Sequence, residues 1–158
     1  SLKSIELNTS IMNEFYIIGI SVRTTNENNQ VAIDIPALWE RFMVEGIIDK
    51  IPNKIDATIY CLYTDYESDH TKPYTTILGC KVATIENVPE GMVAKHIEGG
   101  HYGEINLQGN LLNGLVYNAW TSIWNANLDR KFTTDYEVYA QNNTDMTNAV
   151  VDIFISLK

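Results

Sequence analysis

The sequence is poor in basic residues, and this shortage bears on what the chain can bind. Its 158 residues include 11 Lys and Arg against 20 Asp and Glu, which gives a formal net charge of −9 at pH 7. A phosphate backbone attracts positive charge, so direct binding of nucleic acid by this chain is disfavoured. An acidic surface favours encounter with small cations, although many soluble proteins are simply acidic.

Cysteine is also scarce, and the two cysteines fit no redox or metal motif. Cys61 and Cys80 stand too far apart for a CxxC pair, and each lies in an apolar, strand-like run, YCLY and LGCKV. We expect two buried, reduced thiols in a cytoplasmic protein. No apolar run approaches the roughly 18 residues of a membrane span. The N-terminal SLKSIELNTS lacks the apolar core of a signal peptide, so we expect no membrane contact.

Signatures of metal binding and of nucleophilic catalysis are missing as well. His70, His96 and His101 form no HxxxH pattern on a helix, and there is no GxSxG elbow. The glycines of EGGHYG lack the spacing of a phosphate-binding loop and indicate a strand end with a tight turn. The motifs therefore predict no metal, no cofactor and no catalytic residue.

What is present indicates one globular domain over residues 1–158, because 45% of the chain is hydrophobic and its length suits a single core. Runs of aromatic and β-branched residues predict strands, and apolar residues at helical spacing predict helices. We place Pro36 in the first turn of the first helix, which ends near Gly46. The predicted strands are 15–22, 57–66, 74–85, 91–100, 134–139 and 149–157, with a polar turn at 141–148 before the last, and the predicted helices are 35–47 and 106–124.

The order strand, helix, strand, strand occurs twice, over about 15–88 and 91–158. Such a repeat predicts an α+β fold of two pseudo-symmetric β-α-β-β halves, with antiparallel strands and with helices outside. A central pocket is expected where the halves meet. The apolar stripes of the two helices consist of Leu38, Trp39 and Phe42 in the first, and of Leu112, Leu115, Val116, Ala119, Trp120 and Ile123 in the second.

The segment TTDYEVY, residues 133–139, places an acid within an aromatic strand. Alternate side chains of a strand point to opposite faces, so Asp135, Glu137 and Tyr139 share one face while Tyr136 and Val138 share the other. A carboxylate in an apolar cleft costs several kcal/mol unless it is protonated, hydrogen-bonded or matched by a cation. Tyrosine hydroxyls can hydrogen-bond it, and aromatic faces attract cations. Periodicity alone leaves a solvent-exposed sheet face equally open for Glu137.

The chain resembles the effector-binding domain of GyrI-like and AraC-type regulators, which also occurs in Rob and BmrR. The resemblance covers nearly the whole chain and rests on the order of IPALWERF, IYCLYTDYESD, YTTILGCKV, VPEGM, GGHYGEI, the helix reaching Trp120, and FTTDYEVY. It implies a two-half α+β domain whose pocket carboxylate, here Glu137, attracts cationic aromatic ligands. The further ligand-binding residues are predicted to be Tyr139, Trp39, Trp120, Phe42, and Tyr60 or Tyr63, of which strand parity lets only one face the pocket directly.

Regulators of this group carry a helix-turn-helix region before this domain, and the sequence ahead of Phe15 is too short for one, so we expect a stand-alone ligand-binding module. The leading hypothesis is non-covalent binding of a lipophilic, cationic aromatic molecule as an effector in transcription regulation. Two alternatives stay open. One is a hydrolase that uses Glu137 as a general base, with Glu67 or Glu104 as a candidate partner. The other is a gyrase-inhibitor type of protein that binds a protein partner through its surface acids.

Overall fold

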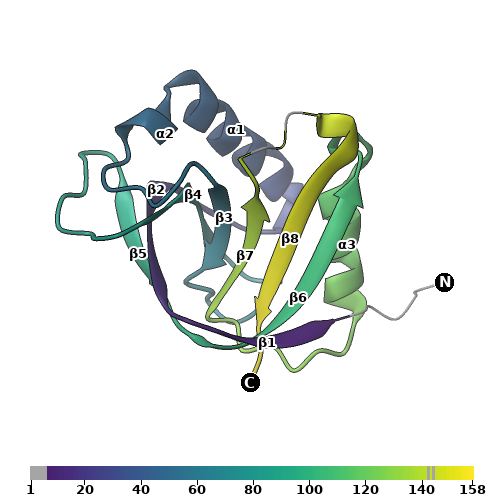
Figure 1. Ribbon diagram of the computed structural model, residues 1–158. Helices are drawn as coiled ribbons and strands as arrows, with labels where there is room; N and C mark the ends of the chain where they lie inside the picture. The colour runs from purple at the N-terminus through teal and green to yellow at the C-terminus, as the bar shows by residue number, and fades with distance from the viewer. Residues whose placement is uncertain (1–6, 142, 144) are drawn as a thin grey trace.

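The computed structural model describes residues 7–141, 143 and 145–158, in which eight strands form one antiparallel sheet (Figure 1). Residues 1–6, and Asn142 and Thr144 of the predicted polar turn, lie outside the described residues. The strands are β1 (Asn8–Met12), β2 (Phe15–Thr24), β3 (Ile59–Thr64), β4 (Tyr74–Val82), β5 (Val93–Ile97), β6 (Gly100–Gly109), β7 (Thr134–Tyr139) and β8 (Ala149–Ser156). The helices are α1 (Val31–Val44), α2 (Ile47–Lys50) and α3 (Leu115–Asn125).

The sheet is symmetric about the junction between β3 and β7. Its order is β1-β6-β8-β7-β3-β4-β2-β5. Outward from the centre, the strands follow as β3-β4-β2-β5 on one side and, in the corresponding order, as β7-β8-β6-β1 on the other. The edge strands are exchanged: β1 precedes β2 in the chain but pairs with β6, while β5 precedes β6 but pairs with β2. The predicted α+β fold with two pseudo-symmetric halves is confirmed. The boundaries of the repeats, 15–88 and 91–158, remain a prediction.

The predicted second helix is wrong over its first half, because residues 106–109 belong to β6. Ile105 and Leu107 of this strand pack against the cluster beneath α3, as the period of two in a strand requires. The helix itself begins at Leu115, after Gly114 with φ +75°. Leu112 therefore stands outside the helical stripe and is 69% exposed.

Helix α1 begins at Val31, four residues before the predicted start. Pro36 consequently lies inside the helix, and its placement in the first turn is wrong. The predicted end is confirmed, because the helix stops at Val44 and Gly46 follows with φ +60°. No helix among the described residues is long and apolar enough to cross a membrane.

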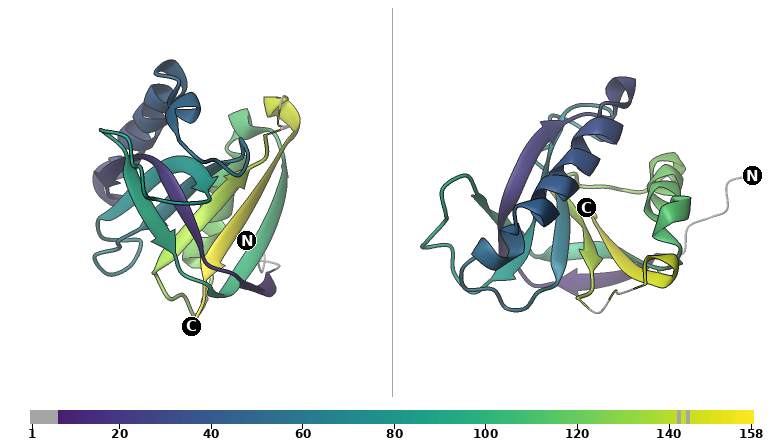
Figure 2. Two further views of the ribbon diagram at one scale, coloured as in Figure 1. Left: turned by 60° about the vertical axis from the view of Figure 1, so that its left-hand side comes forward. Right: turned by 90° about the horizontal axis from the view of Figure 1, so that it is seen from above.

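Both long helices cover the same face of the sheet, one over each half (Figure 2). Cys61, Glu137 and Ile153 are in register across β3, β7 and β8, so their side chains share one face. Cys61 belongs to the cluster beneath α1 and Ile153 to the cluster beneath α3. Cys61 and Cys80 are buried and unpaired, as expected. A third cluster covers the opposite face and consists of Phe15, Ile17, Leu62, Ile77, Ile97, Tyr102, Tyr136 and Phe154.

Gly19 of β2 and Gly79 of β4 stand opposite each other where the two backbones approach closely. A Cβ on Gly79 would lie 2.2 Å from the carbonyl oxygen of Ile18, so the strands would have to separate. We expect Gly79→Ala to lower the free energy of unfolding in urea by about 2–3 kcal/mol. Gly46→Ala is the control: nothing lies within 4 Å of its Cβ, and its positive φ costs only about 1 kcal/mol. Equal losses in the two variants would contradict the close approach.

Candidate functional site

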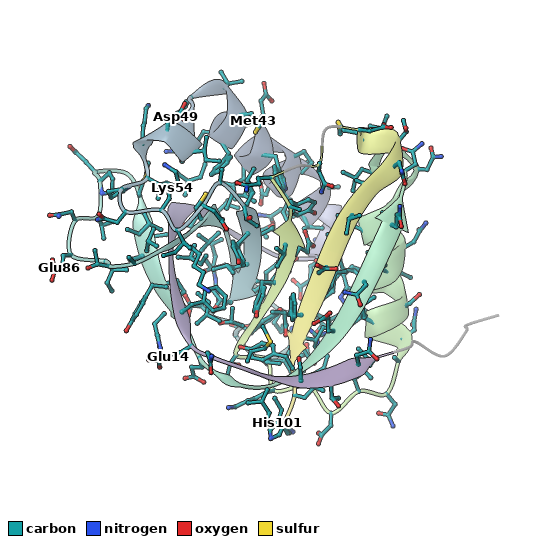
Figure 3. All side chains as sticks on the ribbon, viewed as in Figure 1. Glu14, Met43, Asp49, Lys54, Glu86 and His101 are labelled. Atoms are coloured by element: carbon teal, nitrogen blue, oxygen red, sulfur yellow. The ribbon has the colours of Figure 1, made fainter. Side chains whose placement is uncertain are left out.

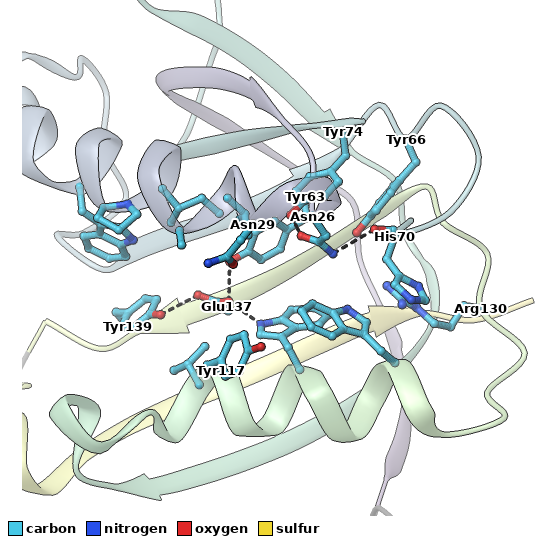
Figure 4. A pocket seen from close by; sticks show the side chains of 18 residues that line it. Asn26, Asn29, Tyr63, Tyr66, His70, Tyr74, Tyr117, Arg130, Glu137 and Tyr139 are labelled. Atoms are coloured by element: carbon cyan, nitrogen blue, oxygen red, sulfur yellow. Dashed lines mark hydrogen bonds between the residues drawn. The ribbon is translucent and has the colours of Figure 1, made fainter. Parts of the chain in front are cut away.

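A cavity of about 310 Å³ lies between α1 and α3, over the central strands β3 and β7 (Figure 4). One wall comes from α1 and the residues before it, and the other from α3. The floor comes from β3 and β7, and the loop after β3 closes one end. Most of the lining is aromatic or aliphatic, including Ile35, Trp39, Tyr74, Val116, Trp120 and Trp124.

The Glu137 carboxylate forms part of the cavity floor and is only 1% exposed. Its Oε2 accepts hydrogen bonds from the Tyr63 hydroxyl and from Trp120 Nε1, each at 2.6 Å. Its Oε1 accepts a hydrogen bond from the Tyr139 hydroxyl at 2.6 Å. Three donors from β3, α3 and β7 thus hold the carboxylate in one orientation, and donors to a charged acceptor give the stronger kind of hydrogen bond.

Glu137 is a buried acid, and no counter-ion contacts it within the part of the chain that the structure describes. Burial raises the pKa of Glu137 above its ordinary value, while the hydrogen bonds from Tyr139, Tyr63 and Trp120 act in the opposite direction. Burial, followed by the Glu137 charge, raises the pKa of the Tyr139 hydroxyl well above its usual range, so this donor stays protonated. The ion pairs among the described residues do not include Glu137.

The structure brings most of the predicted ligand-binding residues together. Glu137, Tyr139, Trp39, Trp120 and Tyr63 all line the cavity. The rings of Trp39 and Tyr139 meet edge to face with centroids 5.0 Å apart, and those of Tyr63 and Trp120 with centroids 5.2 Å apart. Tyr63 is therefore the member of the tyrosine pair that faces the cavity.

Tyr60 and Phe42, which were also predicted as ligand-binding residues, do not line the cavity. Tyr60 points to the opposite face of the sheet, where its ring packs against Phe15 and Tyr136. Phe42 is 1% exposed in the cluster between α1 and the sheet. It shares that side of the helix with Leu38, four residues earlier, whereas Trp39 turns toward the cavity.

A buried ion pair that was not predicted from the sequence lies next to Glu137 on β7. Asp135, also on β7, is fully buried, and its Oδ2 accepts from Arg130 Nη2 at 2.8 Å and from the Tyr66 hydroxyl at 2.6 Å. Its Oδ1 accepts from the backbone N–H of Ser156 at 2.8 Å. Strand parity places Asp135 on the face of Glu137, which is the only signal for this pair in the sequence.

The polar end of the cavity was missed too. Arg130 and His70 line this end, together with Tyr66 and Asn26 (Figure 4). The His70 ring stacks on Trp124 with an interplanar angle of 8°. Burial and the Arg130 charge lower the pKa of His70. Nothing in the sequence pattern links these residues, because they come from separate loops.

Glu137 is the only acidic side chain among the described residues that line the cavity. Glu67 and Glu104, the acids considered as partners in hydrolysis, are not part of the lining. The cavity therefore offers one carboxylate, several hydroxyl and indole donors, and aromatic walls. Such a set suits the binding of a small molecule.

The fold and the cavity define a small-molecule effector-binding protein, in agreement with the resemblance to GyrI-like domains. The chain belongs to the family of the integron-associated effector binding protein Cass2, with a match over residues 11–157. Its relatives include YobU of Bacillus subtilis (strain 168), whose name marks it as a candidate transcriptional regulator. YobU is 26% identical over 144 residues, which cover 89% of this chain and 90% of YobU.

Two solved structures share the fold over almost their full length. The integron cassette protein VCH_CASS2 from the mobile metagenome of Vibrio cholerae has a TM-score of 0.73 and 30% identity, covering 96% of this chain and 95% of its own. SAV2435, solved with tetraphenylphosphonium bound, has a TM-score of 0.77 and 17% identity, covering 98% of this chain and 94% of its own.

Proposed function

We propose that the chain binds a lipophilic aromatic cation in this cavity without covalent chemistry, and that Glu137 supplies the opposing charge. The observation that carries this proposal is a buried carboxylate with no ion-pair partner among the described residues. Removing a carboxylate from water costs several kcal/mol, and its hydrogen bonds recover only part of that cost. A cation that enters the cavity recovers more, because Coulomb attraction is strong where water is excluded.

The hydrogen bonds of Glu137 indicate which cations suit the site. Tyr63, Trp120 and Tyr139 already donate to the carboxylate, so a ligand needs no N–H group of its own. A delocalised or fully substituted cation attracts the carboxylate through charge alone and gains about 0.5–2 kcal/mol from each aromatic face it contacts. Tetraphenylphosphonium, the ligand of SAV2435, has this chemistry.

The family and its relatives support a regulatory use of this binding. The family description is that of an effector-binding protein, and the name of YobU refers to the regulation of transcription. We infer that the bound cation acts as an effector in transcription control. Such a role places the chain in the cytoplasm, where the unpaired Cys61 and Cys80 stay reduced.

Titration with tetraphenylphosphonium tests the proposed function. Trp39, Trp120 and Trp124 all line the cavity, so binding should change the tryptophan fluorescence in a saturable manner. Calorimetry should give the same dissociation constant. Tetramethylammonium, which has charge but no aromatic surface, should bind far more weakly. No saturable signal in either method would contradict the proposal.

The affinity for tetraphenylphosphonium should depend on pH through Glu137. Burial raises the pKa of this carboxyl, and only its ionised form attracts the cation, so affinity should fall as the pH is lowered through that raised pKa. Without ligand, the stability of the fold changes with pH in the opposite direction, because the folded state binds this proton more tightly than the unfolded chain. Protonation therefore stabilises the fold as the pH falls through the raised pKa. Calorimetric titration with tetraphenylphosphonium between about pH 5 and 8 measures the change in affinity, and Glu137→Gln should abolish that change.

A further inference from the structure

The end of the cavity away from Tyr139 contains buried nitrogen atoms without hydrogen-bond partners. Nε and Nη1 of Arg130 and Nδ1 of His70 have no partner among the described residues. Both side chains line the cavity, and that of Arg130 is only 5% exposed. Nε and Nη1 of Arg130 are donors, and His70 Nδ1 donates or accepts according to the tautomer of the ring. Folded proteins pair nearly all of their buried polar groups, so such groups without a partner in the chain can take one from outside it.

The guanidinium of Arg130 is held in place by Asp135 and by the ring of Phe132. Its Nη2 donates to Asp135 Oδ2 at 2.8 Å, and its Cζ lies 4.2 Å from the centre of the Phe132 ring. Asp135 is the acid that opposes an anion here, but both of its oxygens already accept hydrogen bonds, from Arg130, Tyr66 and Ser156. Asp135 therefore neutralises the Arg130 charge and leaves Nε and Nη1 without an acceptor.

The indole ring of Trp120 lies near both Glu137 and the guanidinium of Arg130. Trp120 Nε1 donates to Glu137, and the ring centre of the same side chain lies 6.0 Å from Arg130 Cζ. Figure 4 shows Tyr139 and Glu137 toward one end of the cavity and His70 with Arg130 at the other. One cavity thus contains a carboxylate toward one end and a guanidinium at the other, and the Trp120 ring lies near both.

We propose that Arg130 and His70 form a subsite for a carboxylate carried by the same molecule whose cationic part lies near Glu137. This inference rests on the proposed function of the cavity and narrows its ligand class to zwitterionic aromatic molecules. The planar guanidinium matches the geometry of a carboxylate, and charge-assisted hydrogen bonds are the strongest that a protein offers. An aromatic spacer over Trp120 separates the two charges of the ligand.

A matched pair of phosphonium ions tests this subsite. Tetraphenylphosphonium and (4-carboxyphenyl)triphenylphosphonium differ by one carboxylate, and we expect calorimetry to show about tenfold tighter binding of the carboxylated ion. The methyl ester of that ion should lose most of the gain. Equal or weaker binding of the carboxylated ion would overturn the subsite but leave the proposed function standing. Failure of both ions to bind would overturn the proposed function itself.

Variants of the two residues assign the preference to the subsite. Arg130→Lys keeps a cation beside Asp135 but removes Nε and Nη1, and should abolish the tenfold preference. Arg41→Lys makes the same change in an exposed ion pair of α1 and should retain it. His70→Phe preserves a ring against Trp124 and should reduce the preference severalfold, which gives a test if Arg130→Lys does not fold. Full preference in His70→Phe and in a folded Arg130→Lys would refute the assignment.

Discussion

Glu137→Gln will lower the affinity for tetraphenylphosphonium by roughly a hundredfold. The substitution preserves the size of the side chain and removes its charge. Two unit charges about 6 Å apart interact by about 3 kcal/mol at an effective dielectric constant of about 20, and this difference corresponds to roughly a hundredfold in the dissociation constant. Calorimetry and tryptophan fluorescence measure the change.

Two variants separate the buried charge from other effects. Glu86→Gln removes the same charge from an exposed loop far from the cavity and should change the affinity less than twofold (Figure 3). Tyr139→Phe removes one donor but keeps the carboxylate, so its effect should be smaller than that of Glu137→Gln. An affinity for tetraphenylphosphonium that Glu137→Gln leaves unchanged would refute the role of this carboxylate.

Asp135→Ala will lower the free energy of unfolding by about 3–5 kcal/mol. The variant leaves the Arg130 guanidinium buried without a counter-ion and the hydroxyl of Tyr66 without an acceptor. Uncompensated charge inside a protein is among the most destabilising defects that a single substitution produces. Urea denaturation followed by circular dichroism measures the loss.

The control for this substitution is an exposed ion pair. Asp129, whose side chain is 78% exposed, lies 3.8 Å from Lys158, and Asp129→Ala should cost less than about 1 kcal/mol. The double variant Asp135→Ala/Arg130→Met should be more stable than Asp135→Ala alone, because it removes the unpaired charge as well. Similar losses for Asp135→Ala and Asp129→Ala would contradict the burial of the pair.

Strand parity, a local property, predicts which side chains of β7 share a face, and the family resemblance predicts that the face with Glu137 lines the cavity. Glu137 and Tyr139 share a face in the structure, with Tyr136 and Val138 packed on the other, as the alternation in TTDYEVY requires. The sequence names both Trp39 and Phe42, and only Trp39 lines the cavity, because an apolar stripe does not show which side of a helix faces a cavity and which faces a sheet. That distinction depends on the tertiary packing of α1.

Strand β6 and the Arg130 subsite were not predicted from the sequence, for a related reason. The sequence of β6, GHYGEINLQG, is rich in glycine and polar residues, and its strand forms because β1 and β8 pair with it on both sides. Arg130 and His70 come from loops that only the folded chain brings together. Contacts between distant segments leave no periodic signal in a single sequence.

The central claim is that the cavity selects positive charge, and a pair of ions of equal shape tests it most directly. Tetraphenylphosphonium and tetraphenylborate have the same arrangement of four phenyl rings and opposite charges. If Glu137 provides the buried charge of the site, calorimetry at pH 7.5 will show binding of the phosphonium at least a hundredfold tighter than that of the borate. Equal affinities for the two ions would mean that the cavity recognises shape and apolar surface alone, and would contradict the claim.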